Sequence, residues 1–486
     1  MISKDDIERR LRERAISAQW WGAVPDGFTA LVADSREARP GVLFCAVRGT
    51  RVDGHAFLGA AAAAGAAAAV VESVDTSLGL PQLLVPDSRT ALAHLASLAH
   101  SDPAGSLRLI GVTGTNGKTT TTWLSRHLLG ELGPAAALGT LGLIDASGTA
   151  RPGKLTTPGP IELMRALAEA RASGADLVVM EVSSHALAQR RVEALAFAGA
   201  IFTNLTQDHL DYHADLRRYR EAKLRLAALV EASGACVVNA DDPAWGGAPF
   251  AGRRVIRYGL SPAAEVRAVD VRLDPTGSRW RLVAPEGEAA VHLPLLGEFN
   301  VYNALGAASV ALSMGVRAER VAALLAAAPQ VPGRLEVLAH RPATVLRDYA
   351  HTPDALARTL DAVRPATGGR LFVVFGCGGD RDRGKRPMMG RIAVEKADMA
   401  IVTSDNPRSE SPADIAADIV TGLPEGSYRI VLDRREAIEA ALENARPDDV
   451  VLLAGKGHER VQIFADREIP FDEAEIVAEL TGEGDA

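Results

Sequence analysis

Apolar residues occur along the chain in short, strand-length runs that alternate with longer, alanine-rich stretches of helical character. In the first hundred residues such runs stand at 43–47, 67–72 and 82–85, and a helix is predicted over 89–100. Short β-rich runs between turn signals predict strands, and longer apolar-periodic stretches predict helices. We therefore expect a small α/β domain at the N-terminus.

The middle of the chain shows the same alternation. Residues 109–122 read as a buried strand, a glycine-rich turn and the start of a helix, and β-rich runs follow at 176–181 and 199–203. This order predicts a parallel sheet with helices on both faces and ligands beyond the carboxyl ends of the strands. Residues 253–294 predict a β-rich insertion instead, and an alanine-rich helix begins near Asn300.

The last third of the chain repeats the alternation. Five strand-like runs are separated by helix-length intervals, at residues 345–348, 371–375, 399–403, 428–432 and 450–453. This pattern predicts a second doubly wound α/β domain. Turn-forming segments with proline and glycine mark the domain limits. We expect an α/β protein of three domains, with the boundaries 1–100, 101–331 and 332–486.

Composition is that of an ordinary globular protein. The chain has 486 residues, 47% of them hydrophobic, and a net charge of −8. The negative charge argues against a general nucleic-acid binder, whose affinity rests on a basic surface. The charged N-terminus lacks the apolar stretch of a secretory signal, and no run reaches the roughly 20 apolar residues of a membrane span. Cys45, Cys236 and Cys377 are widely separated, as is typical of reduced core cysteines in a cytoplasmic protein.

The clearest candidate for chemistry is a glycine-rich turn, Gly-Thr-Asn-Gly-Lys-Thr, that begins at Gly114. Gly114 and Gly117 permit backbone angles that a Cβ disfavours, so successive N–H groups can surround an anion at the positive end of a helix. Lys118 would add a charge on the terminal phosphates, and Thr119 would offer a hydroxyl to Mg²⁺. The strict Walker spacing requires a glycine where Val112 stands, so this is a variant phosphate loop.

Two polar clusters follow the later strands of the predicted central sheet. Glu181 opens the sequence Glu-Val-Ser-Ser-His, and His209 lies within residues 204–213. Because the carboxyl ends of parallel strands share one edge, we expect Glu181 and His209 to form a Mg²⁺ site beside Thr119. A hydrogen-bonded loop residue is the alternative for each of them alone. The spacing is not that of a zinc site.

Taken together, these motifs resemble the Mur ligase family over essentially the whole chain. The phosphate loop, the cluster at Glu181, and residues 204–213, 297–300 and 348–351 match the family motifs in order and spacing. The resemblance implies an N-terminal domain for a uridine nucleotide, a central ATPase domain and a C-terminal Rossmann-like domain for an amino acid. The implied reaction activates a peptide carboxylate as an acyl phosphate, which an amine then attacks. Cations and oriented N–H groups must offset repulsion between the anions.

The resemblance also implies the ligands and the residues that hold them. The substrates would be ATP, UDP-N-acetylmuramoyl-L-alanyl-D-glutamate and meso-diaminopimelate, with Mg²⁺ as cofactor, in a cytoplasmic monomer that makes peptidoglycan precursors. ATP would bind to Gly114, Thr115, Asn116, Gly117, Lys118, Thr119, Thr120, Asn300, Arg334 and Asp348. The muramoyl dipeptide would bind to Ser35, Thr156, Thr157, Ser184, Gln189 and Arg191. Diaminopimelate would bind to Arg381, Asp405, Asn406, Arg408, Gly455 and Glu459. The metal would bind to Thr119, Glu181, His209 and carbamylated Lys223, and catalysis would use Lys118, Glu181, His209 and Lys223.

Pattern and resemblance differ at two of these positions. The pattern around Lys223 predicts a solvated helix lysine, whereas the resemblance implies a carbamate that supplies oxygen to a second Mg²⁺. The Asn-Pro pair before Arg408 predicts an exposed turn, whereas the resemblance implies an arginine fork for the far carboxylate of diaminopimelate. The chain departs from some relatives at Pro158, and at Thr50 and Arg51 in the uridine loop.

Two alternatives remain open at this point. A folylpolyglutamate synthetase is the main rival within the ligase class, although residues 34–36 and 405–408 favour the muramoyl ligase. A nucleotide-binding regulator without catalysis is the rival from another class. Glu181 and His209, beside an intact phosphate loop, argue against it.

Overall fold

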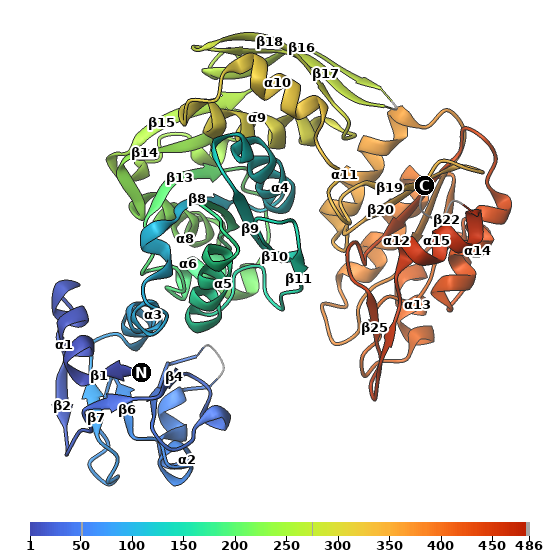
Figure 1. Cartoon of the computed structure of the whole chain (residues 1–486). Helices are drawn as coiled ribbons and strands as arrows, with labels where there is room; N and C mark the ends of the chain where they lie inside the picture. The colour runs from blue at the N-terminus through green and yellow to red at the C-terminus, as the bar shows by residue number, and fades with distance from the viewer. Residues whose placement is uncertain (50–51, 275, 483–486) are drawn as a thin grey trace. The chain divides into compact units, whose positions relative to one another are not determined.

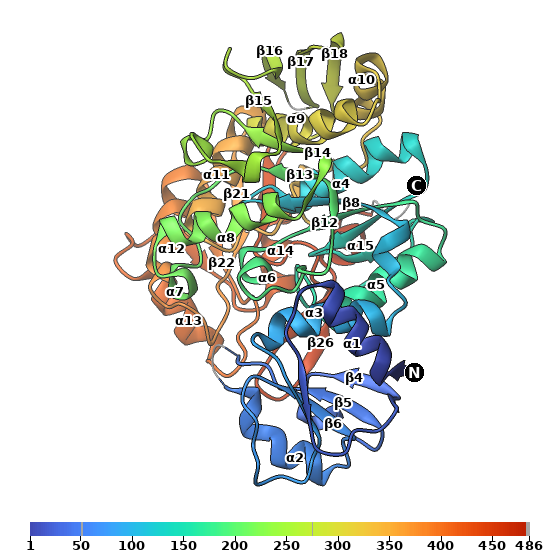
Figure 2. The same ribbon diagram turned by 90° about the vertical axis from the view of Figure 1, so that its left-hand side faces the viewer.

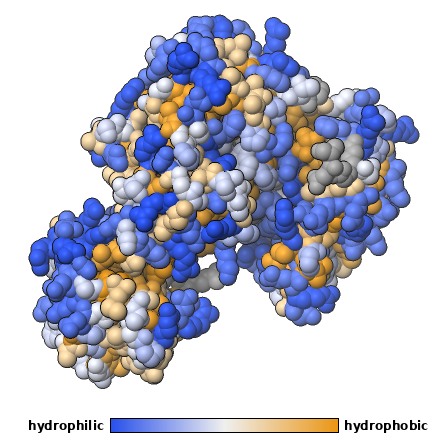
Figure 3. Space-filling view, viewed as in Figure 1, coloured by the Kyte–Doolittle hydropathy of each residue, from blue (hydrophilic) through white to orange (hydrophobic). Residues whose placement is uncertain are grey.

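The computed structural model describes residues 1–49, 52–274 and 276–482, so Thr50 and Arg51 lie outside the described part of the chain. The chain forms two compact units (Figure 1), made of residues 1–267, 284–287 and 302–321, and of residues 268–283, 288–301 and 322–486. On the face in Figure 3, hydrophilic residues are interspersed with hydrophobic ones. No described helix combines the length and apolar character that crossing a membrane requires.

The N-terminal hundred residues form the predicted α/β fold. The five-stranded sheet has the order β2-β7-β6-β5-β4, and the strands β4 to β7 are parallel (Figure 2). Its strands are β2 (Gln19–Trp21), β4 (Ala30–Val32), β5 (Val42–Cys45), β6 (Ala68–Val71) and β7 (Gln82–Leu84), and its helices are α1 (Lys4–Glu13), α2 (Leu58–Ala63) and α3 (Ser88–Ala99). Strands β5 and β6 are buried at every residue, which explains their unbroken apolar sequence. A short pair, β1 (Ile2–Ser3) and β3 (Gly27–Phe28), precedes them.

A second sheet in the first unit has the order β11-β10-β9-β12-β8-β13-β14-β15. Six of these strands run parallel, and β10 and β11 pair antiparallel at one edge. They are β8 (Arg108–Thr113), β9 (Ala135–Gly139), β10 (Gly142–Ile144), β11 (Ala150–Arg151), β12 (Leu177–Glu181), β13 (Phe197–Phe202), β14 (Val230–Asn239) and β15 (Arg254–Gly259). The helices are α4 (Lys118–Leu129), α5 (Pro160–Ala172), α6 (Ser184–Ala188), α7 (Leu210–His213) and α8 (Leu216–Ala228). The predicted parallel sheet is therefore confirmed.

Close packing fixes the central strand of this sheet. Every residue of β8 after Arg108 is buried. At Gly111, a Cβ would meet Leu226 of α8 and Phe197 of β13 at 3.1 Å, so the missing side chain lets the helix approach the strand. The carboxyl end of β8, where the phosphate loop begins, is thereby held in place.

The β-rich insertion predicted over 253–294 is present. It continues from β15 into β16 (Val266–Asp274), β17 (Gly277–Ala284) and β18 (Gly287–Leu293), which are neighbours in that order. The alanine-rich helix then follows as α9 (Glu298–Ser313), succeeded by α10 (Ala318–Ala326).

The C-terminal third forms a six-stranded sheet of order β19-β20-β24-β21-β22-β23, parallel except at the β19 edge. The strands are β19 (Glu336–Ala339), β20 (Thr344–Asp348), β21 (Leu371–Phe375), β22 (Met399–Val402), β23 (Tyr428–Ile430) and β24 (Val450–Ala454). A hairpin of β25 (Val461–Ile463) and β26 (Glu468–Pro470) follows. The helices of this part of the chain are α11 (Pro353–Val363), α12 (Lys385–Lys396), α13 (Pro412–Val420), α14 (Arg434–Asn444) and α15 (Glu473–Thr481).

Alternate residues of β21 show that this sheet is covered on both faces. Val373 and Phe375 join a core with side chains of α11, α12 and α13. Phe372 and Val374 join a separate core with side chains of α14 and α15. Side chains of a strand point to opposite faces in turn, so the doubly wound arrangement predicted for the last third is confirmed.

Candidate active site

The phosphate loop connects β8 to α4, and its two glycines have left-handed backbone angles, with φ of 154° at Gly114 and 81° at Gly117. A Cβ on Gly114 would overlap the hydroxyl oxygen of Thr203, and a Cβ on Gly117 would overlap the amide oxygen of Asn303. The loop can therefore adopt this cradle shape only with glycine at these two positions. Helix α4 begins at Lys118 with no side-chain cap, so the N–H groups of its first turn face the cradle as an anion site would require.

Residues at the end of the neighbouring strand β13 hold the loop. The backbone N–H of Thr115 donates to the Asn204 carbonyl at 2.7 Å, and the N–H of Asn116 donates to the Asn204 side-chain oxygen at 2.9 Å. The Thr203 hydroxyl donates to the Asn116 carbonyl at 2.7 Å. Two of the predicted ATP-binding residues thus use their N–H groups within the protein, which leaves the start of α4 as the source of donors for a phosphate.

Two lysines converge on one carbonyl oxygen in the loop. Lys118 Nζ donates to the carbonyls of Gly114 at 3.1 Å and Thr115 at 2.7 Å, and Lys223 Nζ donates to the Gly114 carbonyl at 2.6 Å. Lys223 is only 1% exposed and lies over the Tyr219 ring. Burial, and then the charge of Lys118, lower the pKa of Lys223 well below its usual value. The interpretation of Lys223 as a solvated helix lysine is therefore wrong.

Glu181 ends β12 and is buried beside two of the predicted substrate residues. Its carboxylate accepts hydrogen bonds from the N–H of Thr140 at 2.8 Å and from the Thr140 hydroxyl at 3.1 Å. The Thr140 hydroxyl also lies 3.1 Å from that of Thr156. The Thr157 hydroxyl donates to the Glu181 carbonyl at 2.9 Å. The structure therefore brings Glu181, Thr156 and Thr157 together, with Thr140 between the first two.

A ring cluster contains the predicted His209. Its imidazole lies 4.7 Å, centroid to centroid, from that of His185, which in turn lies 4.2 Å from the Tyr212 ring. Ser184 Oγ lies 3.0 Å from His213 Nε2. Within the described ranges, no group of three or more His, Cys, Asp or Glu side chains is placed to hold a metal ion. A cation here would need oxygen ligands from bound phosphates and water as well.

The guanidinium of Arg191 is fixed from two sides. It donates to the Thr157 carbonyl at 2.7 Å and to the side-chain oxygen of Gln189 at 2.8 Å. The amide of Gln189 also donates to the Tyr212 hydroxyl at 3.3 Å, which connects these residues to the ring cluster. The predicted muramoyl residues Thr157, Gln189 and Arg191 therefore form one hydrogen-bonded group.

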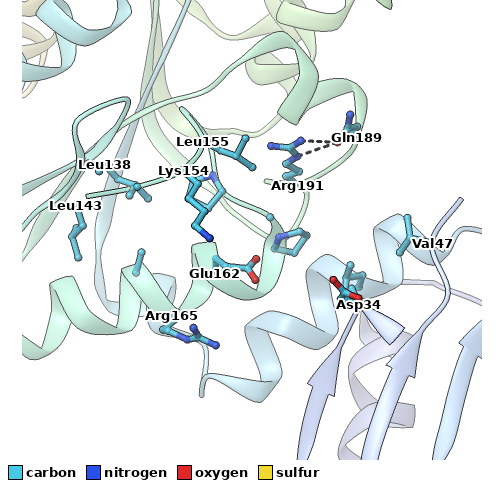
Figure 4. Close-up of a pocket in the computed structure, with 18 of the residues that line it drawn as sticks. Asp34, Val47, Leu138, Leu143, Lys154, Leu155, Glu162, Arg165, Gln189 and Arg191 are labelled. Atoms are coloured by element: carbon cyan, nitrogen blue, oxygen red, sulfur yellow. Dashed lines mark hydrogen bonds between the residues drawn. The ribbon is translucent and has the colours of Figure 1, made fainter. Parts of the chain in front are cut away.

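A cavity of about 1080 Å³ lies beside this group and receives side chains from the N-terminal sheet and from the central one (Figure 4). Gln189 and Arg191 line it, and Ser35 stands between the lining residues Asp34 and Arg36. The cationic lining residues outnumber the acidic ones, with Arg36, Arg48, Arg89, Arg151, Lys154, Arg165 and Arg191 against Asp34, Glu162 and Glu169. The cavity is suited by size and charge to a large anionic ligand.

Comparisons with known proteins identify the family of the chain. Residues 28–100, 112–311 and 333–457 match three family models, described as "Mur ligase family, catalytic domain", "Mur ligase middle domain" and "Mur ligase, glutamate ligase domain". A UDP-N-acetylmuramoyl-L-alanyl-D-glutamate--2,6-diaminopimelate ligase of Gloeobacter violaceus is 46% identical over 463 residues, which cover 94% of each chain. The chain belongs to the Mur ligase family. The ligase of the same name from Syntrophomonas wolfei is 42% identical, over 94% of this chain and 96% of its own.

Solved structures of other ligases share the fold of this Mur ligase. A structure of a UDP-N-acetylmuramoyl-L-alanyl-D-glutamate--2,6-diaminopimelate ligase matches with a TM-score of 0.67 and 33% identity, over 94% of this chain and 95% of the other. A folylpolyglutamate synthase of Mycobacterium tuberculosis matches with a TM-score of 0.64 but 19% identity, over 75% of this chain and 92% of its own. The second similarity shows the fold alone.

Most of the residues predicted for the amino acid come together in the second unit of the Mur ligase. The Asn406 amide donates to Glu459 at 2.8 Å. A Cβ on Gly455 would lie 2.6 Å from a carboxylate oxygen of Asp405. Arg408 donates to the Gly379 carbonyl at 2.9 Å. The half-buried Arg408 has a left-handed φ of 51°, so it is not the simple exposed turn that its neighbours predict.

Arg381 is exposed and borders the same place. A Cβ on Gly378 would lie 2.9 Å from Arg408 Nη1 and 3.8 Å from Arg381 Cγ. The absence of a side chain at Gly378 leaves room for both arginines. Arg381 itself donates to the Asp380 carbonyl at 3.3 Å.

Three of the residues predicted for ATP, Asn300, Arg334 and Asp348, also belong to the second unit of the Mur ligase. The Asp348 carboxylate is buried and accepts a hydrogen bond from the N–H of Leu335 at 2.8 Å. Burial raises the pKa of Asp348, and the charge of Arg334 opposes this. Arg334 stacks over the Tyr349 ring at 4.6 Å. Asn300 is buried, and its amide donates to a backbone carbonyl one turn earlier at 2.8 Å.

Four residues of the site escaped sequence reasoning. Tyr219 stands four residues before Lys223, so a helical wheel places it on the same face. Asn303 follows Asn300 by one helical turn and could have been found by the same spacing. Thr140 lies after β9 in no recognisable motif. Lys456, inside the Gly-Lys-Gly-His-Glu segment, lacked any signal that it would be buried.

Proposed function

We propose that this chain joins meso-diaminopimelate to UDP-N-acetylmuramoyl-L-alanyl-D-glutamate and hydrolyses ATP to ADP and phosphate in doing so. The observation that supports this most is the full-length similarity to relatives that carry this activity in their names, at 46% and 42% identity. The phosphate loop and the cationic cavity of the first unit are what such substrates would require.

The residues of the chain suggest how the reaction would proceed. The peptide carboxylate would attack the terminal phosphorus of ATP, which forms an acyl phosphate and releases ADP. The amine would then attack the acyl carbon, and phosphate would leave. Lys118 would exchange its two carbonyl partners for phosphate oxygens, and Arg191, held by Gln189 and Thr157, would hold an anionic group in the cavity.

The residues of the phosphate loop also suit Mg²⁺. Thr119 offers a buried hydroxyl at the first turn of α4, and Glu181 offers a buried carboxylate whose donors, among the described residues, both belong to Thr140. Hard oxygen atoms of this kind are the ligands that Mg²⁺ prefers. Thr119, Glu181 and His209 would hold the ion, which when bound would neutralise charge on the transferred phosphoryl group.

Lys223 suits carbamylation. A neutral amine is needed, because its lone pair attacks the carbon of CO₂, forms an N–C bond and releases one proton. The lowered pKa of Lys223 favours this neutral amine. The product is an anion beside the cation of Lys118, which removes the repulsion between two ammonium groups and offers oxygen to a second Mg²⁺.

The amino acid is tested by a panel assay. We expect meso-diaminopimelate to be used at least about a hundredfold more efficiently than L-lysine, because lysine leaves the guanidinium of Arg408 without a carboxylate partner. Arg408→Ala should lower kcat/KM for diaminopimelate steeply and change the KM for ATP little. Arg467→Ala, which removes an exposed arginine of the same unit, is the control. Efficient use of L-lysine with diaminopimelate inert would contradict the proposal.

The location is proposed on the cysteines. Cys45, Cys236 and Cys377 are buried and form no disulfide. Cysteines are usually in this reduced state in proteins of a reducing compartment. We therefore propose that this ligase acts in the cytoplasm.

A further inference from the structure

A buried lysine lies behind the predicted amino-acid site. Lys456 follows β24 and has a fully buried side chain. Its Nζ donates to the Val461 carbonyl at 2.6 Å and to the side-chain oxygen of Asn406 at 3.1 Å, and it lies 3.5 Å from Glu459 Oε2. Three acceptors around one nitrogen match the three N–H groups of an ammonium ion.

These contacts decide which way the Asn406 amide points. Lys456 Nζ and the backbone N–H of Ile463, both of them donors, meet Asn406 Oδ1 at 3.1 Å. The Glu459 carboxylate, an acceptor, meets Asn406 Nδ2 at 2.8 Å. Reversing the amide would place donor against donor and acceptor against acceptor, so a single orientation satisfies all three partners.

The fixed orientation gives the Asn406–Glu459 pair a defined polarity. Asn406 Oδ1 is occupied by two donors, while one N–H of Nδ2 has no partner among the described residues. Glu459 Oε2 accepts from Asn406 and Lys456, while Oε1 has no hydrogen bond within the described part of the chain. The pair therefore offers one donor and one acceptor side by side, which suits a group that carries a carboxylate and an ammonium on the same carbon.

Three carboxylates and one guanidinium act on the charge of Lys456. Burial lowers its pKa, the carboxylates of Asp405, Glu459 and Glu473 raise it, and the guanidinium of Arg434 lowers it. Arg434 is itself buried against Glu473 at 2.7 Å. It also donates to the carbonyls that precede Asp405 and the Gly455–Lys456 segment, at 3.3 and 3.0 Å. Removing Lys456 would thus leave Glu459 without its cation while Arg434 still holds the strand ends.

We propose that Lys456 is a positioning residue that fixes the donor and acceptor order of the Asn406–Glu459 pair, and through it the recognition of the zwitterionic end of the amino-acid substrate. This inference rests on the proposed function. It assigns Lys456 no contact with the substrate. Its effect passes through Asn406 and Glu459.

The test uses the full chain and compares KM for meso-diaminopimelate, ATP and the uridine-linked dipeptide. Lys456→Met keeps the apolar stem and removes the donors, and Lys456→Gln keeps a donor without the charge. We expect Lys456→Met to raise the KM for diaminopimelate about tenfold or more, while the other two KM values change by less than about twofold. Lys456→Gln should be intermediate. Lys396→Met, which removes a lysine of α12 that is paired with Asp361 of α11, is the matched control.

A double-mutant cycle separates positioning from general support of the fold. If Lys456 acts through Asn406, adding Lys456→Met to Asn406→Ala should raise the KM for diaminopimelate by less than about a further twofold. Full additivity would overturn the proposal. So would a lower kcat and melting temperature with all three KM values unchanged. If Lys456→Met fails to fold, the same comparison is made with Lys456→Gln.

The wild-type protein distinguishes the two levels of inference. If it uses diaminopimelate but Lys456→Met and Lys456→Gln keep its KM within about twofold, the positioning role is wrong and the proposed function stands. If it does not use diaminopimelate at all, the proposed function fails and the positioning role fails with it.

Discussion

At the scale of single residues, the site depends on two glycines that leave no room for a Cβ and on two lysines that share one acceptor. Gly114 and Gly117 have neighbours that a Cβ would overlap, so the loop can form only without side chains there. Lys118 and Lys223 share the Gly114 carbonyl as acceptor, which brings two ammonium groups close together. Such a pair favours neutralisation of the more buried amine, Lys223.

Replacing Lys223 tests this arrangement. Lys223→Ala should abolish most ligase activity, and short carboxylic acids in solution should restore part of it, because they can supply the missing oxygen ligand. The rate of ADP formation with and without added acetate measures this. Lys396→Ala should keep full activity and show no response to the acid. Full activity of Lys223→Ala would contradict the proposed role of Lys223 in catalysis.

The dependence of stability on pH tests the hydrogen bonds of the Glu410 carboxylate. The hydrogen bonds from Arg386, and then that from the N–H of Asp380, lower the pKa of Glu410 from 4.5 to about 2. Because the pKa is lower in the folded state, this group stabilises the fold above pH 4.5 and loses its effect as the pH falls towards 2. Glu410→Gln should therefore lower the urea midpoint at pH 7 more than at pH 3. An equal loss at both pH values would contradict the argument.

At the scale of elements, the site lies where strands end and helices begin. The phosphate loop follows β8 and Glu181 is the last residue of β12, while Tyr219 and Lys223 occupy one face of α8. The helix starts at an N-cap, Asp215, whose side chain accepts a hydrogen bond from the N–H of Arg218. The cap therefore helps to set the position of Lys223.

Removing this cap should loosen α8. Asp215→Ala is expected to destabilise the helix by about 1 kcal/mol, because an N–H of the first turn loses its acceptor. Faster hydrogen exchange at the amides of α8, with little change in α5, would show this. Asp215→Ser, which retains a capping oxygen, is the control. Unchanged exchange in α8 would show that tertiary packing alone holds the helix.

At the scale of the whole molecule, the residues proposed to bind the substrates are distributed over the two units. Lys118 and Glu181 belong to the first unit with the cationic cavity, and Arg334 and Arg408 belong to the second. Catalysis by such a chain needs every substrate, whereas a nucleotide-binding regulator needs only ATP.

Phosphate release separates these two functions. We expect release from ATP only when the uridine-linked dipeptide and diaminopimelate are both present, because the acyl phosphate forms on the dipeptide and is consumed by the amine. Omission of either one should reduce the rate to the background of a Lys118→Ala variant. Steady hydrolysis of ATP alone, at the rate of the complete mixture, would favour the regulator.

The sequence alone was enough to predict the α/β class, both doubly wound sheets and the phosphate loop. Strand runs such as 371–375 are buried on both faces, so their apolar sequence is continuous and easy to recognise. The loop glycines were predictable because the backbone angles they need are a local property. The resemblance to the family supplied the remaining candidate residues, from motifs that stand in order along the chain.

Only the tertiary structure decided the environment of those residues. The burial of Lys223 and Lys456 arises from chain segments far away in sequence, and no local pattern distinguishes them from exposed lysines. Thr140 meets Glu181 because β9 and β12 are neighbours in the sheet. Burial, hydrogen-bond partners and shifted pKa values depend on which segments pack together, and that is a property of the folded chain rather than of any stretch of its sequence.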